Sequence, residues 1–132
     1  VDYCKSKGIA VTAYSPLGSP GLVKRMNNED CVLNIMEDVH IVKIAEKHKK
    51  SPAQVALRYI VQRGIAAIPK SVKPERIRSN IDIFDFKLDE EDFERIKIID
   101  QGPHGRICDF SFLKGINEHP QFPFERLSVS RN

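Results

Sequence analysis

Two short runs of apolar residues, at residues 8–14 and 65–68, contain almost no polar positions. Gly8 begins the first run and Pro16 lies just after it, while Pro69 ends the second. Strands that are covered on both faces of a parallel sheet have this unbroken apolar composition, whereas strands with one solvent-facing side alternate. The pattern therefore predicts two short buried strands, each followed by a loop.

Apolar residues recur at helical spacing between the two predicted strands. Asp38 is placed to cap a helix that runs to about residue 49. His40 and His48 lie on this helix and are interpreted as ordinary exposed residues. The side chains expected on its inner face are Val39, Ile41, Val42, Ile44 and Ala45.

Capping residues or proline mark the starts of three more helices. Residues 51–54, Ser-Pro-Ala-Gln, form a capping box with proline at the first helical position, and Gly64 is placed to end that helix. Pro74 opens a helix that runs to about Asn80, and Asp89 caps a last one. The inner face of the last helix is expected to hold Phe93, Ile96 and Ile99.

Strands that alternate with helices imply right-handed crossovers between parallel strands, so the predicted fold class is α/β. Two strands alone do not make a stable parallel sheet with two buried faces. The chain also begins at Val1 rather than at methionine. We therefore expect a piece of something larger, in which most of the sheet lies elsewhere. Residues 22–35 are expected to form an extended excursion, and the aromatic-rich segment from residue 101 onward an ordered tail.

The composition argues against several classes of protein. The chain has 132 residues, whereas a complete (β/α)₈ barrel needs about 250. A formal net charge of +3 is too small to indicate a nucleic-acid or membrane partner, and no apolar run is long enough to span a membrane. Cys4, Cys31 and Cys108 are too widely spaced for a zinc site or a disulfide framework. A cytoplasmic, reducing location and no bound metal are therefore expected.

The loop after the second strand is suited to an anionic ligand. Residues 65–80 contain four basic residues and one acid, so this short segment carries the same +3 as the whole chain. It leads into a predicted helix N-terminus, where free N–H groups and the helix dipole favour phosphate. Arg76 falls in the first turn of that helix, and Asn80 lies four residues later on the same face. A solvated basic loop has the same composition, but the strand–loop–helix context favours phosphate.

The loop after the first strand offers hydroxyl groups and backbone N–H groups. Ser15 and Ser19 supply the hydroxyls, and Leu17 and Gly18 supply N–H groups. Tyr14 ends its strand, which is where ligands bind in parallel α/β folds, so its ring is placed to stack on a flat heterocycle. A tyrosine of the core is the alternative interpretation. An unrelated doubly wound phosphate binder would require Gly-x-Gly-x-x-Gly, which is absent.

These motifs resemble a known family. Residues 8–20, with Tyr-Ser-Pro-Leu-Gly-Ser-Pro, are similar to the seventh strand and following loop of the aldo-keto reductases. Residues 68–77, with Ile-Pro-Lys-Ser-Val, resemble the signature after the eighth strand. Residues 51–58, 84–88 and 123–124 resemble the intervening helix and the tail of that family. The aldose and aldehyde reductases are the most similar group, and the resemblance covers nearly the whole chain except residues 22–36.

The resemblance implies the C-terminal part of a (β/α)₈ TIM barrel: strands seven and eight, their helices and the tail. Residues 1–132 would be a partial NADP-dependent oxidoreductase domain, with 101–132 as its substrate-loop tail. The parent would reduce small-molecule aldehydes or ketones with NADPH, as a cytoplasmic monomer with no nucleic-acid or membrane partner. The residues implied to bind NADP(H) are Tyr14 at the nicotinamide, Ser15, Leu17 and Ser19 along the pyrophosphate, and Lys70, Ser71, Val72, Arg76 and Asn80 at the adenosine end.

The tail would contribute part of the substrate pocket, with Cys108 facing the substrate and Phe110 in the pocket wall. A free thiol of no consequence is the alternative interpretation of Cys108. The catalytic Asp, Tyr, Lys and His of the family belong to the first half of the barrel, and no residue here corresponds to them. The isolated chain is therefore expected to be inactive. A short product without catalysis, acting as a nucleotide-binding or interaction module, is the second hypothesis.

Three positions depart from the family's usual pattern. Gly21 stands where an acid often latches the loop over the cofactor. Ser79 replaces a common acid beside the adenine, which weakens that expected contact. Gly105 stands where a tryptophan often precedes the arginine of the substrate loop, so the substrate range does not follow from the sequence.

Overall fold

The computed structural model describes residues 1–19, 34–106 and 113–124. None of the helices in these ranges is both long enough and apolar enough to cross a membrane. The elements, in chain order, are α1 (Asp2–Ser6), β1 (Thr12–Ala13), α3 (Val39–His48), α4 (Pro52–Gln62), β2 (Ala66–Ala67), α5 (Pro74–Ile81), α6 (Glu90–Ile98) and the 3₁₀ helices η2 (Gly102–Gly105) and η3 (Ile116–Glu118).

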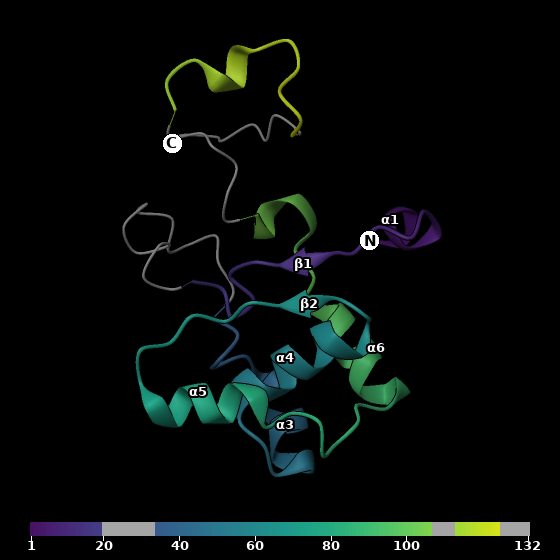
Figure 1. The fold of residues 1–132 in the computed structure, drawn as a ribbon, viewed down its shortest axis with the longest axis vertical. Helices are drawn as coiled ribbons and strands as arrows, with labels where there is room; N and C mark the ends of the chain where they lie inside the picture. Colours follow the sequence, from purple (N-terminus) through teal and green to yellow (C-terminus); the bar gives the residue numbers. More distant parts are fainter. Residues whose placement is uncertain (20–33, 107–112, 125–132) are drawn as a thin grey trace.

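The two strands lie side by side and parallel, which confirms the prediction. Thr12 pairs with Ala66, and the Ala66 N–H donates to the Val11 carbonyl at 3.0 Å. Helix α4 packs against β2, and α3 packs on the other side of α4, so these two helices form successive layers on the β2 side of the strand pair (Figure 1). Because the strands are parallel, the loops that follow them leave from the same edge of the sheet.

The prediction that both strands are buried on two faces is wrong for this chain. Ile9 and Tyr14, in or beside the first strand, have exposed fractions of 54% and 62%, and Ile68 after β2 is also exposed. Ile65, directly before β2, is buried. The reason is that, among the described residues, the helical layers formed by α4 and α3 lie on the β2 side of the pair.

Helix α3 begins and ends as predicted, but the residues that it buries differ in part from those predicted. The Asp38 carboxylate accepts hydrogen bonds from the N–H groups of His40 and Ile41, and Lys49 ends the helix in the left-handed conformation at φ 54°. Ile41 and Ile44 are buried, whereas Val39, expected on the inner face, is exposed. Helix α3 packs against both α4 and α6, and these two contacts bury the side of the helix that carries Ile41.

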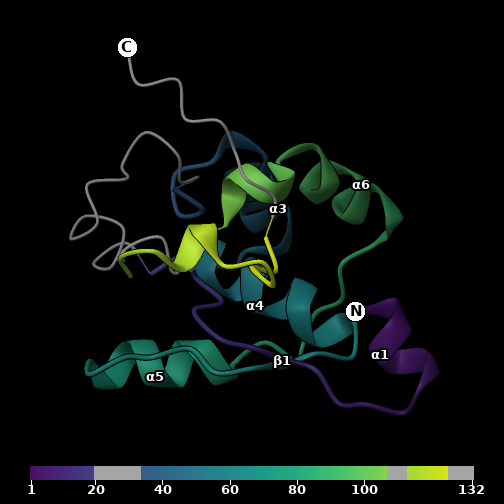
Figure 2. The ribbon, with the colours of Figure 1, turned by 90° about the horizontal axis from the view of Figure 1, so that it is seen from above.

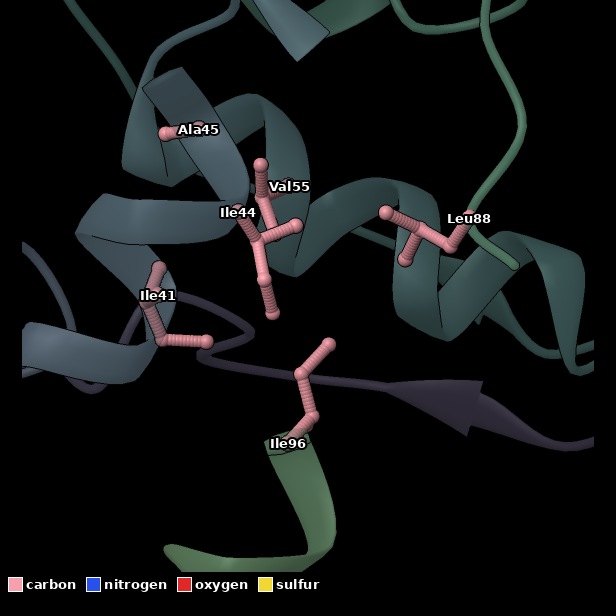
Figure 3. Packing of buried hydrophobic residues seen from close by; sticks show 6 residues of the cluster. All are labelled: Ile41, Ile44, Ala45, Val55, Leu88 and Ile96. Atoms are coloured by element: carbon pink, nitrogen blue, oxygen red, sulfur yellow. The ribbon is translucent and has the colours of Figure 1, made fainter. Parts of the chain in front are cut away.

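The hydrophobic core lies where α3, α4 and α6 meet, and Figure 3 shows side chains from these helices together with Leu88 from the segment just before α6. Ile96 on α6 is buried, and Phe93 and Ile99 pack against the same cluster, as predicted. The buried members of the cluster are Ile41, Ile44, Ala45, Val55, Leu88 and Ile96.

A capping box begins each of the helices α4 and α6, at the starts that the sequence predicts. The Gln54 N–H donates to Ser51 Oγ at 3.3 Å, and the Ser51 N–H donates back to Gln54 Oε1 at 3.0 Å. Asp89 and Asp92 make the same reciprocal pair at the start of α6, at 3.0 and 3.1 Å. Gly64, at φ +69°, terminates the α4 segment in the conformation that favours glycine.

Replacing Ser51 by Ala is expected to lower the free energy of unfolding by about 1 kcal/mol, because it removes the cap of α4. Urea unfolding followed by far-UV circular dichroism measures the change. Ser6→Ala in α1 is the control, since its hydroxyl donates to the Tyr3 carbonyl within the same short helix. Equal losses in the two variants would contradict a specific role for the α4 cap.

The N-terminal helix α1 lies beside β1 at the right-hand edge of both views (Figures 1 and 2). Near the N-terminus, Lys5 Nζ donates to the carbonyl of Arg63 at the end of α4. In the tail, the Arg106 guanidinium lies 4.2 Å from the centroid of the Phe124 ring. This contact brings together the chain on either side of residues 107–112. The predicted excursion at residues 22–35 falls mostly outside the described residues.

Candidate functional site

The loop after β1 has an unusual backbone. Ser15 and Ser19 both have positive φ, at 46° and 43°, and Gly18 has φ 80°. The Gly18 N–H donates to the Ser15 carbonyl at 3.0 Å, which closes a tight turn. Left-handed conformations at non-glycine residues cost free energy and gather at ligand-binding loops. The turn is therefore pre-shaped around the two serines that the sequence singled out.

Tyr14 lies between this turn and the β1–β2 pair, and its exposed ring is not part of the described core. The alternative interpretation of Tyr14 as a core tyrosine is therefore wrong for this chain. Leu17 in the turn is half-buried. The strand end thus presents an aromatic ring to solvent, next to a turn with two serine hydroxyls.

The loop after β2 leads directly into α5. Ser71 Oγ accepts a hydrogen bond from the Lys73 N–H at 3.2 Å, which shapes the last turn before the helix. Lys73 is the N-cap residue and gives the helix no side-chain cap, and Pro74 follows at the first helical position. The start of α5 therefore carries Lys73 and Arg76 against the single acid Glu75, and no side chain caps it. These are features of an anion-binding helix start.

The residues of this segment that the family resemblance assigns to the cofactor divide into two groups by exposure. Lys70, Val72 and Arg76 are exposed, whereas Ser71 and Asn80 are half-buried. Ser71 and Asn80 line the same cavity of about 320 Å³ between α4, β2 and α5. The residues of the β1 loop are not among its lining residues. The other lining residues are Leu57, Val61, Ala67, Pro69, Ile77, Ile81, Ile83 and Phe84.

The two residues assigned to the substrate pocket, Cys108 and Phe110, lie outside the described residues. Within the described ranges, no three His, Cys, Asp or Glu side chains gather in a way that would hold a metal ion.

Sequence reasoning missed a group of ionisable side chains around the buried Asp92 carboxylate, the Asp92 cluster, made by Lys47, His48, Asp89 and Asp92. The Asp92 side chain is 1% exposed, and its oxygens lie 2.9 Å from Lys47 Nζ and 2.6 Å from His48 Nε2. Lys47 Nζ also contacts Asp89 Oδ2 at 2.6 Å. The interpretation of His48 as exposed is wrong, because its side chain is 15% exposed and its ring packs 5.3 Å from that of Phe86.

Electrostatics explains how the Asp92 carboxylate is tolerated in the interior. Burial alone would raise the pKa of Asp92, but hydrogen bonds from Lys47 and His48 outweigh it and hold the pKa below its usual range. Hydrogen bonds to Asp89 and Asp92 also raise the pKa of Lys47. The cluster joins the end of α3 to the start of α6, so it is a structural clamp. The one sequence signal was Asp92 as the third residue of the α6 capping box.

The comparisons with known proteins agree with the motifs. The protein-family model described as "Aldo/keto reductase family" matches residues 1–101 of this chain. Aldo-keto reductase family 1 member A1-A of Danio rerio is 41% identical over 128 residues, which cover 94% of this chain and 39% of that protein. Prostaglandin F synthase 1 of Bos taurus is 44% identical over 124 residues, covering 94% of this chain and 36% of that protein.

Solved structures give the same result. The aldose reductase of Schistosoma japonicum matches with a TM-score of 0.74 and 34% identity, over 96% of this chain and 35% of that chain. The chain thus spans less than two fifths of the length of these relatives. Aldo-keto reductases are TIM barrels, and the parallel pair joined by helices is consistent with that architecture. The resemblance inferred from the motifs is confirmed: this chain belongs to the aldo/keto reductase family.

Proposed function

We propose that the chain is the C-terminal part of an aldo-keto reductase barrel, with β1 and β2 as strands seven and eight and residues 101–132 as the tail. The observation that carries the proposal is the parallel pairing of β1 with β2, each followed by the expected family motif at the same edge. The exposed face of this pair supports it as well, because Ile9 and Ile68 lie on a surface that further strands would cover.

The two loops would together hold NADP(H). Tyr14 would stack on the nicotinamide, and the left-handed turn of Ser15, Leu17 and Ser19 would follow the pyrophosphate. The fit rests on the shape of this turn and on the uncapped, basic start of α5. The residues proposed for the adenosine end are Lys70, Ser71, Val72, Arg76 and Asn80.

The parent protein would reduce an aldehyde or ketone to an alcohol. When bound, NADPH supplies the hydride for the carbonyl carbon. In this chain, Tyr14 would orient the nicotinamide face toward the substrate, and Cys108 and Phe110 would form part of the substrate pocket. A tyrosine outside residues 1–132 would supply the proton. The parent is further proposed to be a cytoplasmic monomer that acts on a small-molecule carbonyl. No observation favours the alternative of a non-catalytic module.

The test compares the affinities of the parent barrel for NADPH and NADH. The parent barrel is the longer protein that contains this chain, or a fusion of this chain to the preceding part of a family relative. Replacing Arg76 by Met removes a planar, permanently charged group at a helix start and keeps the apolar stem. NADPH binding is expected to weaken by about 10- to 150-fold, corresponding to roughly 1.5–3 kcal/mol, while NADH binding barely changes. Fluorescence quenching titrations of both cofactors measure the effect.

Arg78→Met is the matched control, because Arg78 is also an exposed arginine of α5 but points to a different side of the helix. It is expected to leave the ratio of NADPH to NADH affinity near the wild-type value. If Arg76→Met weakens both cofactors equally, Arg76 is a structural residue and the assignment of the adenosine end is wrong.

A further inference from the structure

Helix α5, which carries Arg76 and Asn80, is weakly held by apolar contacts. None of its residues is buried. Its apolar residues Ile77 and Ile81 line the 320 Å³ cavity toward α4 rather than filling it, and both remain exposed. Figures 1 and 2 both place α5 at one edge of the molecule, on the far side of α4 from α6. The position of this helix therefore depends on contacts at its ends.

The C-terminal end of α5 is held by polar contacts from the start of α4. Gln54, a buried side chain, donates through Nε2 to the Asp82 carbonyl at 2.7 Å, and Asp82 is the C-cap residue of α5. Lys50 Nζ donates to Asp82 Oδ2 at 3.1 Å and to Asp85 Oδ2 at 2.8 Å. It also lies 5.5 Å from the centroid of the Phe86 ring. We call these five residues the Lys50 network.

The charges in this network suit the end of a helix. The Lys50 side chain is 12% exposed, and its ammonium lies 3.5 Å from the carbonyl of Asp82, the C-cap residue of α5, where a cation stabilises the helix dipole. The hydrogen bond to Asp85 raises the pKa of Lys50, and the same bond lowers the pKa of Asp85, so both stay charged at neutral pH. Gln54 serves two helices at once, because its Oε1 completes the capping box of α4 while its Nε2 holds α5.

We propose that the Lys50 network is a positioning device, in which Lys50 and Gln54 fix the direction of α5 and thereby place Arg76 and Asn80 for the adenosine end of the cofactor. The proposal rests on the proposed function of α5. At roughly 1.5 Å per residue, Arg76 lies about 9 Å along the helix from Asp82. A tilt of about 10° at the anchored end would move it by roughly 1.5 Å, which exceeds the ~0.5 Å tolerance of a binding constellation.

The first measurement is hydrogen–deuterium exchange of the α5 amides in the parent barrel that contains this chain. Lys50→Met keeps the stem of the side chain and removes the cation. Gln54→Glu keeps the acceptor that caps α4 but removes the donor that holds Asp82. Both are expected to speed exchange in α5 by roughly 5- to 10-fold, while exchange in α3 and α6 stays unchanged. Lys97→Met is the control, because Lys97 is exposed and pairs with Glu94 within α6.

The second measurement is the ratio of NADPH to NADH affinity in the parent barrel. Lys50→Met is expected to lower this ratio by about 5-fold, since a displaced Arg76 loses contact with the extra phosphate and NADH has none. Lys50→Arg, which keeps the cation, is expected to restore both readouts. A general loss of stability would lower the affinity for both cofactors and leave the ratio unchanged.

The outcomes separate the two proposals. Unchanged α5 exchange in both Lys50→Met and Gln54→Glu would overturn the positioning role. Faster exchange with an unchanged cofactor ratio would also overturn it, provided that Arg76→Met changes the ratio. If Arg76→Met leaves the ratio unchanged while Lys50→Met still speeds α5 exchange, the network holds α5 as inferred and the assignment of α5 to the cofactor is wrong.

Discussion

The 132-residue chain, mixed with NADPH and a reactive aromatic aldehyde, is expected to oxidise NADPH only at the background rate. The family resemblance implies that the catalytic Asp, Tyr, Lys and His lie outside residues 1–132, so we expect that no positioned acid protonates the carbonyl oxygen. General acid catalysis typically contributes 10²–10⁴-fold, or roughly 3–5 kcal/mol of the barrier. The reduction in rate is expected to be at least that large, because the chain alone also does not hold the substrate and the hydride donor in a reactive orientation.

Absorbance of NADPH measures the rate, with the relative from Danio rerio as the positive control under the same conditions. Joining the chain to the preceding part of a family relative is expected to restore turnover, which tests whether the chain supplies a usable cofactor cradle. Turnover at an enzyme-like rate by the 132-residue chain alone would contradict the proposal that the catalytic groups lie elsewhere in the parent.

Local signals in the sequence predicted the elements of the fold well. The Ser51–Gln54 capping box, the proline at position 74 and the Asp89 cap each place a helix start through groups that lie within a few residues of one another. The parallel pairing of β1 and β2 also followed from the order of elements, because a helical crossover returns the chain in the same direction.

Burial could not be predicted in the same way, because it depends on partners distant in the chain. Ile9 and Val39 have apolar side chains in suitable patterns and are nevertheless exposed, since no described element covers them. His48 was misinterpreted for the opposite reason, because its partner Asp92 lies 44 residues away and the pair forms only when α3 meets α6. Periodicity reports which face of a helix is apolar, and it does not report which neighbour selects that face.

The candidate site also combines features that are local in the sequence with features that are not. The basic character of residues 65–80 and the start of α5 are local, so the sequence indicated an anion-binding segment. The left-handed turn at Ser15 and Ser19 is a backbone property that neither residue type reveals, since serine rarely adopts positive φ. The Lys50 network could not be predicted from the sequence, because it depends on tertiary contacts between residues about thirty positions apart, one of them through a backbone carbonyl group.

Replacing Asp92 by Asn is expected to destabilise the chain by about 3 kcal/mol at neutral pH. The substitution keeps the size of the side chain but removes the charge that faces Lys47 and His48. Removing one partner of a buried pair typically costs roughly 3–5 kcal/mol, because the other charge is left without compensation. The lower end applies, since Lys47 is 41% exposed and still contacts Asp89.

The effect should depend on pH in a defined direction. The pKa of Asp92 in the folded chain lies below the ordinary value of 3.8, so its carboxylate contributes stability that is fully present above that value. This contribution is lost as the pH falls through the lower pKa of the folded state. The difference in unfolding free energy between wild type and Asp92→Asn is therefore expected to stay constant from neutral pH down to about pH 5 and to shrink below about pH 4.

Urea unfolding at several pH values, followed by circular dichroism, measures this difference. Glu91→Gln is the matched control, because Glu91 is an exposed carboxylate of the same helix that pairs with Arg95 four residues later. Its cost is expected to be below about 1 kcal/mol, as for other exposed pairs. If Asp92→Asn costs no more than Glu91→Gln at neutral pH, the Asp92 cluster does not clamp α3 to α6, and the core around Ile44 and Ile96 alone joins the two helices.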